Sequence, residues 1–386
     1  MTPRHTWIAS PAELDAAVER WRSENEIAFD TEFVYERTYR PRPGLVQLAV
    51  GSEVALVDAV ALADLGALGE LLSAPRVLKV VHSGDADVAL LERLAGVRTT
   101  PVFDTQIGAA FCGLGPALSY AALVEAVSGV TLAKAETRTD WTRRPLRPEQ
   151  LRYATEDVAH LPAAATQLRA RLRELCRLEW ALEDSAAAVA VALEVPDAER
   201  SWRRVRGFGG LRGEARRVAR ELAAWREREA ERLDLARPFL LRDETLLALA
   251  HRGELAPDDA RRLPGFDARR HAPHVESWRL ALAAARAAAA LAPAAPEPRP
   301  PGRELVAARE RLDERIAAAA AEIGRALELP AELLLSRRQR ERLIAEWDGA
   351  APLSGSLTGF RRDLLGEALD CLVPSDDDRA LFVARD

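Results

Sequence analysis

Short apolar runs typical of strands alternate with helical patterns over the first half of the chain. The runs at 27–33, 45–50, 54–57 and 77–81 predict strands, and Gly51 with Ser52 predicts a hairpin turn between the second and third. Helical patterns occupy 12–22, 65–72 and 87–94, and another helix is expected from Thr105, after Val102 and Phe103. This alternation indicates an α/β domain with a mixed sheet flanked by helices.

The second half of the chain is helical in pattern throughout. One long helix is expected over 149–172, introduced by Pro148, with helix continuing to about Leu193 and a break at 194–197. Closely spaced prolines indicate an extended linker. We therefore predict an α/β domain over 1–200, helical domains over 208–292 and 303–386, and a Pro-rich linker over 293–302. Leu240-Leu241 and Leu334-Leu335 fall in similar contexts, which hints at an internal repeat.

Charge is more informative locally than in total. The 386 residues carry a formal net charge of −6, so the chain as a whole is not a polycation, and arginine supplies nearly all the positive charge. Between Trp202 and Arg220 the only acidic residue is Glu214. The same stretch contains a run of arginines, namely Arg203, Arg204, Arg206, Arg212, Arg216, Arg217 and Arg220. Contact with nucleic-acid phosphates and solubilisation of a helix both explain such a run.

The chain shows no pattern of a membrane or secreted protein. It has no uncharged apolar run of about twenty residues, and residues 1–22 contain no signal-peptide core. Cys112, Cys176 and Cys371 are widely spaced and odd in number, which fits free thiols in a reducing cytosol. No long apolar heptad suggests a dimer. We therefore expect a cytoplasmic monomer.

Two carboxylates interrupt the apolar strand at 27–33. Side chains at i and i+2 point the same way along a strand, so Asp30 and Glu32 lie side by side on one face. Buried like charges need cations, and Mg²⁺ or Mn²⁺ are natural partners for carboxylate oxygens. A polar strand face that is simply solvated is the alternative. Asp87 lies on a later helix, and Tyr153 and Asp157, four residues apart, share one helix face.

This order of acids resembles the tyrosine branch of the DEDD exonuclease superfamily, and most closely the bacterial ribonuclease D family. Six motifs carry the resemblance: Phe29-Asp30-Thr31-Glu32-Phe33, His82-Ser83-Gly84 followed by Asp87, Phe103-Asp104-Thr105-Gln106, Ser128-Gly129-Val130-Thr131-Leu132, Arg138-Thr139-Asp140-Trp141, and Tyr153-Ala154-Thr155-Glu156-Asp157. Residues 225–250 resemble the helicase-and-RNase-D C-terminal (HRDC) domain, and 333–342 with 364–368 resemble a second, divergent copy.

The resemblance implies an RNase H-like exonuclease domain followed by two all-α HRDC domains. It also implies a 3′–5′ exoribonuclease that trims precursor tRNA and other small structured RNAs, releasing nucleoside 5′-monophosphates by two-metal-ion hydrolysis. By the same resemblance Asp30 bridges two divalent ions, Mg²⁺ or Mn²⁺. Glu32 and Asp157 complete one ion site, and Asp87 holds the other ion, largely through water. Tyr153 orients the attacking water and helps to deprotonate it.

Further residues near the expected site have both functional and structural interpretations. Substrate contacts are expected from His82, Arg138 and Trp141, although a hydrogen-bonded histidine and an ion pair beside a packed indole explain them as well. Asp85 is expected at the surface or as a helix cap, Asp104 as an N-cap, and Glu156 off the catalytic face. Residues that could line the cleft are Gln47, Tyr35 and Tyr39.

Two other functions fit parts of the pattern. The same acids serve DNA exonucleases, but the sequence carries no polymerase or helicase module and the paired helical domains favour RNA. A non-catalytic nucleic-acid-binding protein could keep the fold, but it would be expected to lose at least one of the four acids or the tyrosine.

Overall fold

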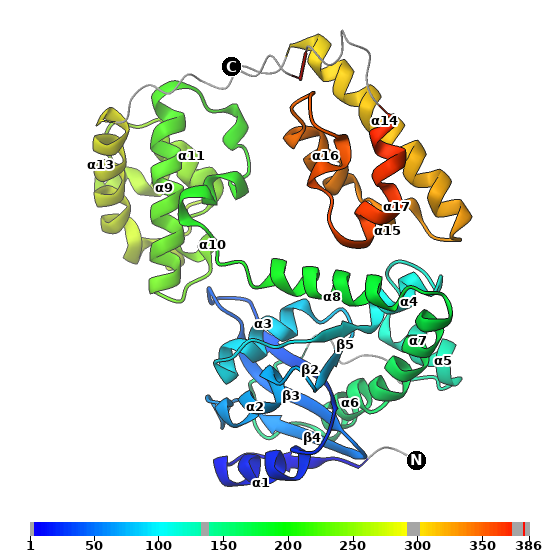
Figure 1. Cartoon of the computed structure of the whole chain (residues 1–386). Helices are drawn as coiled ribbons and strands as arrows, with labels where there is room; N and C mark the ends of the chain where they lie inside the picture. The colour runs from blue at the N-terminus through cyan, green and yellow to red at the C-terminus, as the bar shows by residue number, and fades with distance from the viewer. Residues whose placement is uncertain (1–3, 133–138, 292–301, 373–380, 383–386) are drawn as a thin grey trace. The chain divides into compact units, whose positions relative to one another are not determined.

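The computed structural model describes residues 4–132, 139–291, 302–372 and 381–382 (Figure 1). Arg138 and residues 293–301 of the expected linker lie outside these residues. Contacts within the chain define two compact units. Unit 1 comprises Met1–Glu32, Pro43–Leu193 and Pro300–Asp386, and unit 2 comprises Phe33–Arg42 and Glu194–Arg299. Each unit is described by itself below.

Unit 1 is built on a six-stranded mixed sheet with the order β1-β4-β3-β2-β5-β6. β3 and β4 form the predicted antiparallel hairpin, whereas β1 pairs with β4, β2 with β5 and β5 with β6 in parallel. Phe29, Val80 and Phe103 are fully buried on this sheet. The strands are β1 (Thr6–Ile8), β2 (Glu26–Val34), β3 (Arg42–Val50), β4 (Glu53–Asp58), β5 (Leu78–Val81) and β6 (Val102–Asp104).

Helices flank this sheet, as the alternating pattern predicted. Ser10 caps the first one: its hydroxyl accepts from the Glu13 N–H at 3.4 Å, and the Glu13 carboxylate accepts from the Ser10 N–H at 3.0 Å. Residues 65–72 form a short 3₁₀ turn, η1 (Gly66–Leu68), which runs into α2 (Gly69–Ser73). The other early helices are α1 (Pro11–Trp21), α3 (Asp85–Ala95), α4 (Thr105–Phe111) and α5 (Tyr120–Ser128).

The prediction of one helix over 149–172 is wrong. The structure has α6 (Pro148–Ala159) and α7 (Leu161–Glu174), which meet at His160. Pro162 has no N–H to donate to the Val158 carbonyl, and its ring would clash with that carbonyl in a continuous helix, so α6 ends before it. The His160 N–H donates to the Val158 carbonyl instead. A second break precedes α8 (Leu178–Ala192), where Cys176 has a φ of 56°.

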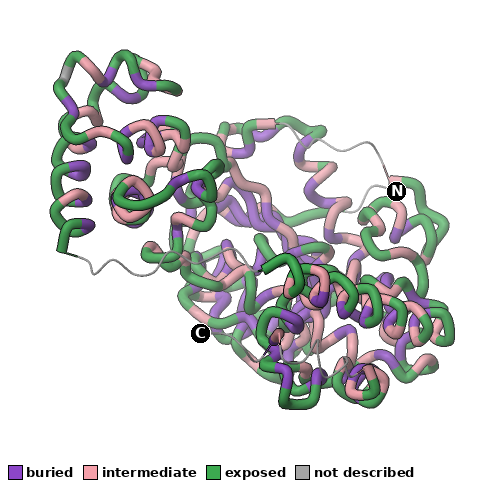
Figure 2. Tube along the Cα trace, turned by 90° about the horizontal axis from the view of Figure 1, so that it is seen from above, coloured by how far each residue is buried: buried purple, intermediate pink, exposed green. Residues whose placement is uncertain are grey.

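Beyond residue 197 every regular element in the described residues is helical. Unit 2 contains η2 (Ala198–Arg204), η3 (Phe208–Gly210), α9 (Gly213–Arg232), α10 (Arg237–Leu240), α11 (Asp243–Ala250), η4 (Pro257–Arg262), α12 (Ala268–His271), η5 (Ala272–His274) and α13 (Val275–Leu291). The helical part of unit 1 contains α14 (Arg303–Ala326), α15 (Ala331–Leu334), α16 (Arg337–Glu346), η6 (Leu353–Ser356) and α17 (Gly359–Asp370). Buried and exposed positions alternate along the helices, as amphipathic helices require (Figure 2).

The two helical modules repeat one backbone path, which confirms the hint given by the paired leucines. A long helix ends in a left-handed residue, Asp234 (φ 46°) in the first module and Glu328 (φ 55°) in the second. The residue after it donates its N–H back to a carbonyl five residues earlier. Leu235 donates to the Ala230 carbonyl at 2.9 Å, and Leu329 donates to the Gly324 carbonyl at 2.8 Å. A four-residue helix then ends in the buried pairs Leu240-Leu241 and Leu334-Leu335.

Packing within each unit fixes its module. In unit 2 the buried Trp278 donates its indole N–H to the Leu240 carbonyl at 3.0 Å. In unit 1 the second module packs on α8, where Phe360 stacks on Trp180 with ring centroids 5.2 Å apart. Among the described residues no helix is both long enough and apolar enough to cross a membrane.

Candidate active site

Strand β2 and helices α3 and α6 bring the four predicted acids and the tyrosine together. Carboxylate oxygens of Asp30 and Glu32 on β2 and of Asp157 on α6 all lie within 4.8 Å of one another. Asp87 on α3 is tied to the same strand, because its Oδ1 accepts from the Thr31 N–H at 3.1 Å and from the Thr31 hydroxyl. The structure therefore places all four acids around one strand.

The turn before α3 sets the position of Asp87. Ser83 has a φ of 53°, and a Cβ on Gly84 would lie 2.5 Å from the Cβ of Val81, so this turn requires glycine there. The Asp104 carboxylate accepts from the Ser83 and Gly84 N–H groups at 3.0 and 3.2 Å. It also accepts from the Gln106 N–H at 2.8 Å, which confirms Asp104 as the N-cap of α4.

Helix α6 presents Tyr153 and Asp157 on one face, and both side chains line the same cavity. At the start of this helix the Gln150 Oε1 accepts from the Arg147 N–H at 3.0 Å.

Asp85 is exposed on α3 and accepts from the Ala86 N–H at 2.9 Å, so its expected surface location is confirmed.

Burial raises the pKa of every acid in the cluster, and repulsion from the other acids raises the pKa of Asp30 and Glu32 further. Burial, with repulsion from the other three acids, raises the pKa of Asp30 well above its usual range. Burial, followed by repulsion from Asp157 and Asp87, raises the pKa of Glu32 to about 8. Burial raises the pKa of Asp157 to about 7 and that of Asp87 to about 6. In the described part of the chain no Lys or Arg forms an ion pair with these acids.

This donor set fits divalent cations. It offers only carboxylate oxygens, which are the ligands that hard ions such as Mg²⁺ and Mn²⁺ prefer. A bound cation also removes the repulsion that raises the pKa values. Asp30, Glu32 and Asp157 are placed to share one such ion.

Tyr153 stays a phenol in this setting. Burial raises its pKa first, and repulsion from Asp157 and Glu32 raises it further. A protonated hydroxyl beside carboxylates can donate and orient, whereas it cannot act as a free base near neutral pH.

A cavity of about 180 Å³ opens beside Asp30, Asp157 and Tyr153, and its other walls are Phe29, Leu161, His82 and Tyr120. The His82 Nε2 lies 3.0 Å from the Leu118 carbonyl, and its Nδ1 lies 2.9 Å from the Thr105 hydroxyl. Because a carbonyl only accepts, Nε2 carries the proton. Burial lowers the pKa of His82, which favours this neutral form. His82 is thus a hydrogen-bonded residue whose ring lines the cavity.

Tyr120 is a cavity residue that the sequence analysis missed. Its ring lies 5.5 Å from that of His82, and its hydroxyl donates to the Glu156 carbonyl at 3.3 Å. A single aromatic residue just after the Ser119 cap of a helix carries no sequence signal of its own. Its proximity to Asp30 and Asp157 arises from the way α5 packs.

Trp141 is 2% exposed and lies behind Tyr153, with ring centroids 6.1 Å apart, rather than in the cavity wall. Arg144, also missed from the sequence, holds this segment by pairing with both carboxylate oxygens of Asp58 and donating to the Trp141 carbonyl at 2.8 Å. A Cβ on Gly44 would lie 2.6 Å from that same carbonyl, so the close approach requires glycine.

The other candidate cleft residues are not among the residues that line this cavity. Gln47 is fully buried on β3, and neither of its amide atoms has a hydrogen-bond partner in the described residues. Tyr35 and Tyr39 belong to unit 2, where they line a different cavity.

Comparisons with known proteins agree with this geometry. A family model described as a 3′–5′ exonuclease matches residues 5–173, and one described as an HRDC domain matches residues 215–282. The chain is 36% identical to ribonuclease D of Pseudomonas paraeruginosa over 379 residues, which are 95% of this chain and 97% of that protein. It is 33% identical to ribonuclease D of Escherichia coli over 373 residues, which are 95% and 97% of the two chains.

The crystal structure of Escherichia coli RNase D, described as an exoribonuclease involved in structured RNA processing, is similar to the whole chain. It matches with a TM-score of 0.84 and 31% identity, covering 96% of this chain and 98% of that one. The similarity in sequence and in fold extends over nearly the full length of these ribonuclease D proteins. The chain therefore belongs to the ribonuclease D family and is a 3′–5′ exoribonuclease.

Proposed function

We propose that this exoribonuclease trims 3′ trailer nucleotides from precursor tRNA and other small structured RNAs, releasing nucleoside 5′-monophosphates. The observation that carries the proposal is the carboxylate cluster, in which oxygens of Asp30, Glu32 and Asp157 lie within 4.8 Å of one another with Asp87 bound to the same strand. The description of the Escherichia coli relative as an enzyme of structured RNA processing supports this class of substrate.

The acids divide between two divalent ions in this proposal. Asp30 would be shared, Glu32 and Asp157 would complete one ion site, and Asp87 would serve the other. When bound, Mg²⁺ or Mn²⁺ would make a water nucleophilic and stabilise the charge on the leaving 3′ oxygen. The raised pKa values of these acids mean that the ions compete with protons for the same oxygens.

Tyr153 would position the attacking water. Its side chain lines the same cavity as Asp30 and Asp157, so it lies next to carboxylates that would hold the metal. Trp141 packs behind the ring and Arg144 fixes the Trp141 backbone, so these two residues would hold the tyrosine in place. Phe29 and Leu161 give the cavity an apolar side that could contact the terminal base or sugar.

The test uses a 5′-labelled precursor tRNA with a short 3′ trailer, incubated with Mg²⁺, with Mn²⁺ and with chelator. We expect a ladder that shortens from the 3′ end and stalls near the mature terminus, only when metal is present. The Asp30→Asn protein is the control for a contaminating nuclease.

Two other results would redirect the proposal. Tight binding without shortening, with either metal, would indicate a binding protein that keeps the fold. Equal digestion of matched RNA and DNA strands would remove the preference for RNA.

A further inference from the structure

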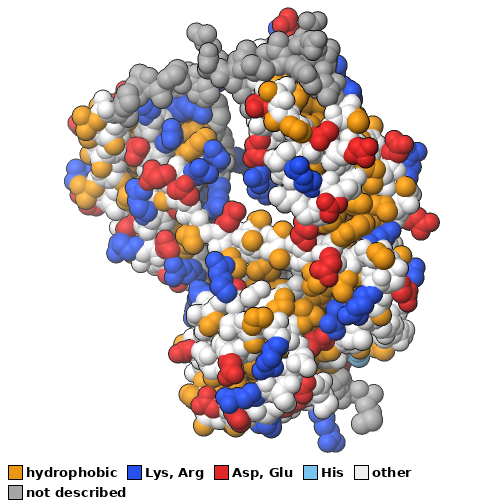
Figure 3. Space-filling model, viewed as in Figure 1, with side chains coloured by type: hydrophobic (Ala, Val, Ile, Leu, Met, Phe, Trp, Pro, Cys, Tyr) orange, Lys and Arg blue, Asp and Glu red, His pale blue; other side chains and the backbone are white. Residues whose placement is uncertain are grey.

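Unit 2 contains a cavity of about 510 Å³ with strongly basic walls, which we name the arginine pocket. The 33–42 segment, the end of η2 and the region around α10 form its walls. Tyr35, 58% exposed, lies at its edge, and Tyr39 lines it with Asp243 and Glu244. Five arginines line it: Arg204, Arg206, Arg226, Arg237 and Arg242. Arginine side chains are numerous on the face of this unit seen in Figure 3.

Three of these arginines have carboxylate partners. Arg226 pairs with Asp243 at 2.7 Å, Arg242 lies 3.8 Å from Glu244, and Arg237 pairs with both oxygens of Glu227.

The other two arginines leave the pocket with unbalanced positive charge. Within the described residues, Arg204 and Arg206 have no carboxylate within ion-pair distance. Arg226 is 4% exposed, and its buried Nε has no hydrogen-bond partner there either. The pocket therefore has both excess positive charge and an unused buried donor.

A buried network holds the pocket in shape without a ligand. Glu227 is 2% exposed and accepts from the Tyr39 hydroxyl at 2.7 Å, in addition to its two contacts with Arg237. The Arg237 guanidinium lies 4.8 Å from the centroid of the Tyr39 ring. A guanidinium restrained on two sides loses little conformational freedom when an anion binds.

The second helical module shows that the fold does not need these charges. At the positions equivalent by the shared backbone path, Arg226, Glu227, Arg237 and Arg242 are replaced by Ala320, Ala321, Ala331 and Ser336. The same long helix, short helix and paired leucines form there without them. Burying charged groups is unfavourable unless they are well paired, so their presence in the first module alone indicates a role other than folding.

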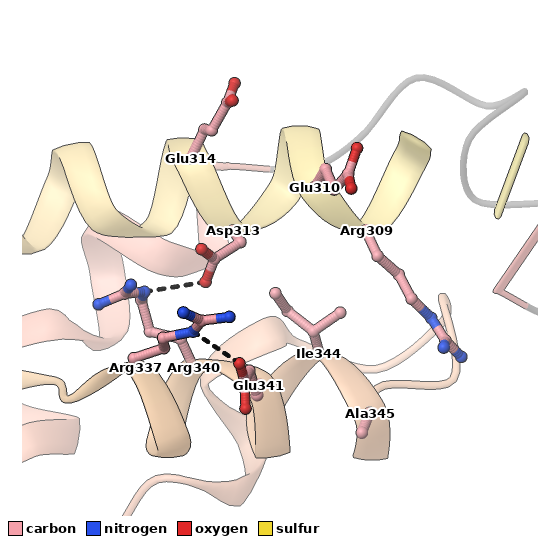
Figure 4. Close-up of a pocket in the computed structure, with 9 residues that line it drawn as sticks. All are labelled: Arg309, Glu310, Asp313, Glu314, Arg337, Arg340, Glu341, Ile344 and Ala345. Carbon is pink, nitrogen blue, oxygen red and sulfur yellow. Dashed lines mark hydrogen bonds and ion pairs between the residues drawn. The ribbon is translucent and has the colours of Figure 1, made fainter. Parts of the chain in front are cut away.

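The cavity of the second module differs from the arginine pocket, because its positive charges are balanced by carboxylates. It measures about 530 Å³, lies between α14 and α16, and is lined by three arginines and four carboxylates (Figure 4). Arg340 pairs with Asp313 and Arg337 with Glu341, each at 2.8 Å (Figure 4). This cavity therefore has no excess positive charge to attract an anion.

We propose that the arginine pocket binds a backbone phosphate of the substrate RNA, through Arg204 and Arg206 with support from the free Nε of Arg226. Guanidinium groups match the geometry of phosphate oxygens better than other side chains do. The exposed Tyr35 ring at the edge could stack on a neighbouring base, which is how proteins commonly hold single-stranded RNA. This inference rests on RNA being the substrate, as proposed above.

The same stretch of chain provides a matched control. Arg203 and Arg220 lie outside the pocket, with their guanidinium groups 5.4 and 5.5 Å from the centroid of the Trp202 ring. The pairs Arg204→Gln/Arg206→Gln and Arg203→Gln/Arg220→Gln therefore remove equal charge from neighbouring places. All four side chains are exposed, so both proteins should fold. Thermal melts check this.

Binding is measured by fluorescence anisotropy in chelator, with a 5′-fluorescein RNA hairpin that has a single-stranded 3′ extension. We expect the Arg204/Arg206 pair to weaken binding by about tenfold or more and to lower the slope of log K against log salt by about 1. The Arg203/Arg220 pair should weaken binding by less than about threefold. Equal weakening by both pairs would mean diffuse attraction and would overturn the inference, as would no weakening by the first pair.

A second measurement separates this inference from the proposed activity. Hydrolysis of an RNA dinucleotide with Mg²⁺ should be equal in the wild-type protein and the Arg204/Arg206 variant, because the single internucleotide phosphate of a dinucleotide is the one that is cleaved at the acid cluster. A drop in dinucleotide turnover in that variant would contradict the pocket's assigned role. If the wild-type protein cleaves no RNA, the proposed function fails, while the binding comparison still decides whether the pocket holds RNA.

Discussion

The acid cluster of unit 1 and the arginine pocket of unit 2 are opposites in charge but alike in one respect. Four carboxylates gather around β2 without a cation partner among the described residues, and Arg204 and Arg206 gather in the pocket without a carboxylate partner there. Ordinary ion pairs elsewhere in the chain, such as Arg361 with Asp184, are balanced.

Unbalanced charge in a concave place indicates a ligand of the opposite sign. The two regions differ in how much they depend on that ligand. Asp87 is buried and the other three acids are half-buried, and repulsion adds to burial for Asp30 and Glu32, so the pKa values of the acids rise. The free arginines are exposed to solvent, which screens them. Changes in the cluster should therefore have larger effects than changes in the pocket.

The largest effect is expected for Asp30→Asn, which removes the carboxylate that two ions would share. We expect RNA hydrolysis to fall by about 10⁴-fold, equal to roughly 5 kcal/mol of transition-state stabilisation. RNA binding in chelator should be nearly unchanged. Asp85→Asn, an exposed acid on α3, is the matched control and should retain activity. Substantial turnover by Asp30→Asn would remove Asp30 as the shared ligand.

Glu227→Ala tests the paired part of the pocket, because it leaves Arg237 without its carboxylate. We expect a loss of about 3 kcal/mol in the free energy of unfolding, measured by denaturant titration. The double variant Glu227→Ala/Arg237→Ala should recover a large part of this loss, since alanines occupy the equivalent positions 321 and 331 of the second module. If the double variant is less stable than the single one, the two modules are not equivalent at these positions.

Without metal, the acid cluster should bind protons in the folded protein, and this should make the stability of the protein depend on pH. The pKa values of Asp87, Asp157 and Glu32 are raised to about 6, 7 and 8 in the folded protein, so between about pH 4 and 8 the folded chain binds more protons than the unfolded chain. Metal-free stability should therefore fall as the pH rises through this range.

Metal affinity should change in the other direction, since bound ions displace those protons. We expect it to rise between pH 6 and 8 by about tenfold per pH unit for each proton displaced. The measurement is the increase in Tm on adding Mg²⁺ at pH 6 and at pH 8. An equal increase at both values would show that the acids are already ionised at pH 6.

The smallest effect is expected for Tyr153→Phe, which removes one hydroxyl from the cluster and no charge. We expect kcat to fall by about tenfold with KM nearly unchanged, because one hydrogen bond that positions the water is worth roughly 1 kcal/mol. Steady-state kinetics on a short RNA would measure this. An unchanged kcat would exclude Tyr153 from the mechanism.

The arginine run between Trp202 and Arg220 illustrates what the sequence left open. Phosphate contact and helix solubilisation explained all seven residues equally well. In the structure Arg212 and Arg217 donate to backbone carbonyls, Arg216 lies over the ring of Phe208, and Arg204 and Arg206 line the pocket. Arginines of identical chemistry differ only in their three-dimensional neighbours, which no local pattern encodes.

The sequence by itself determined the α/β class, the strand hairpin, the two helical modules and the set of acids. These follow from local rules: alternation along a strand, spacing on a helix, and motifs whose order is preserved along the chain. The helix break at His160 was also encoded locally, in Pro162, but the helical pattern over 149–172 outweighed it in the prediction.

Only the tertiary structure decided which distant residues meet. Tyr120 reaches the acids because α5 packs beside them, Arg144 holds Trp141 through Asp58 on β4, and the 33–42 segment joins unit 2 through the bond from Tyr39 to Glu227. Each of these contacts spans tens of residues or more, and packing free energy over the whole fold selects it rather than any property of the segment itself.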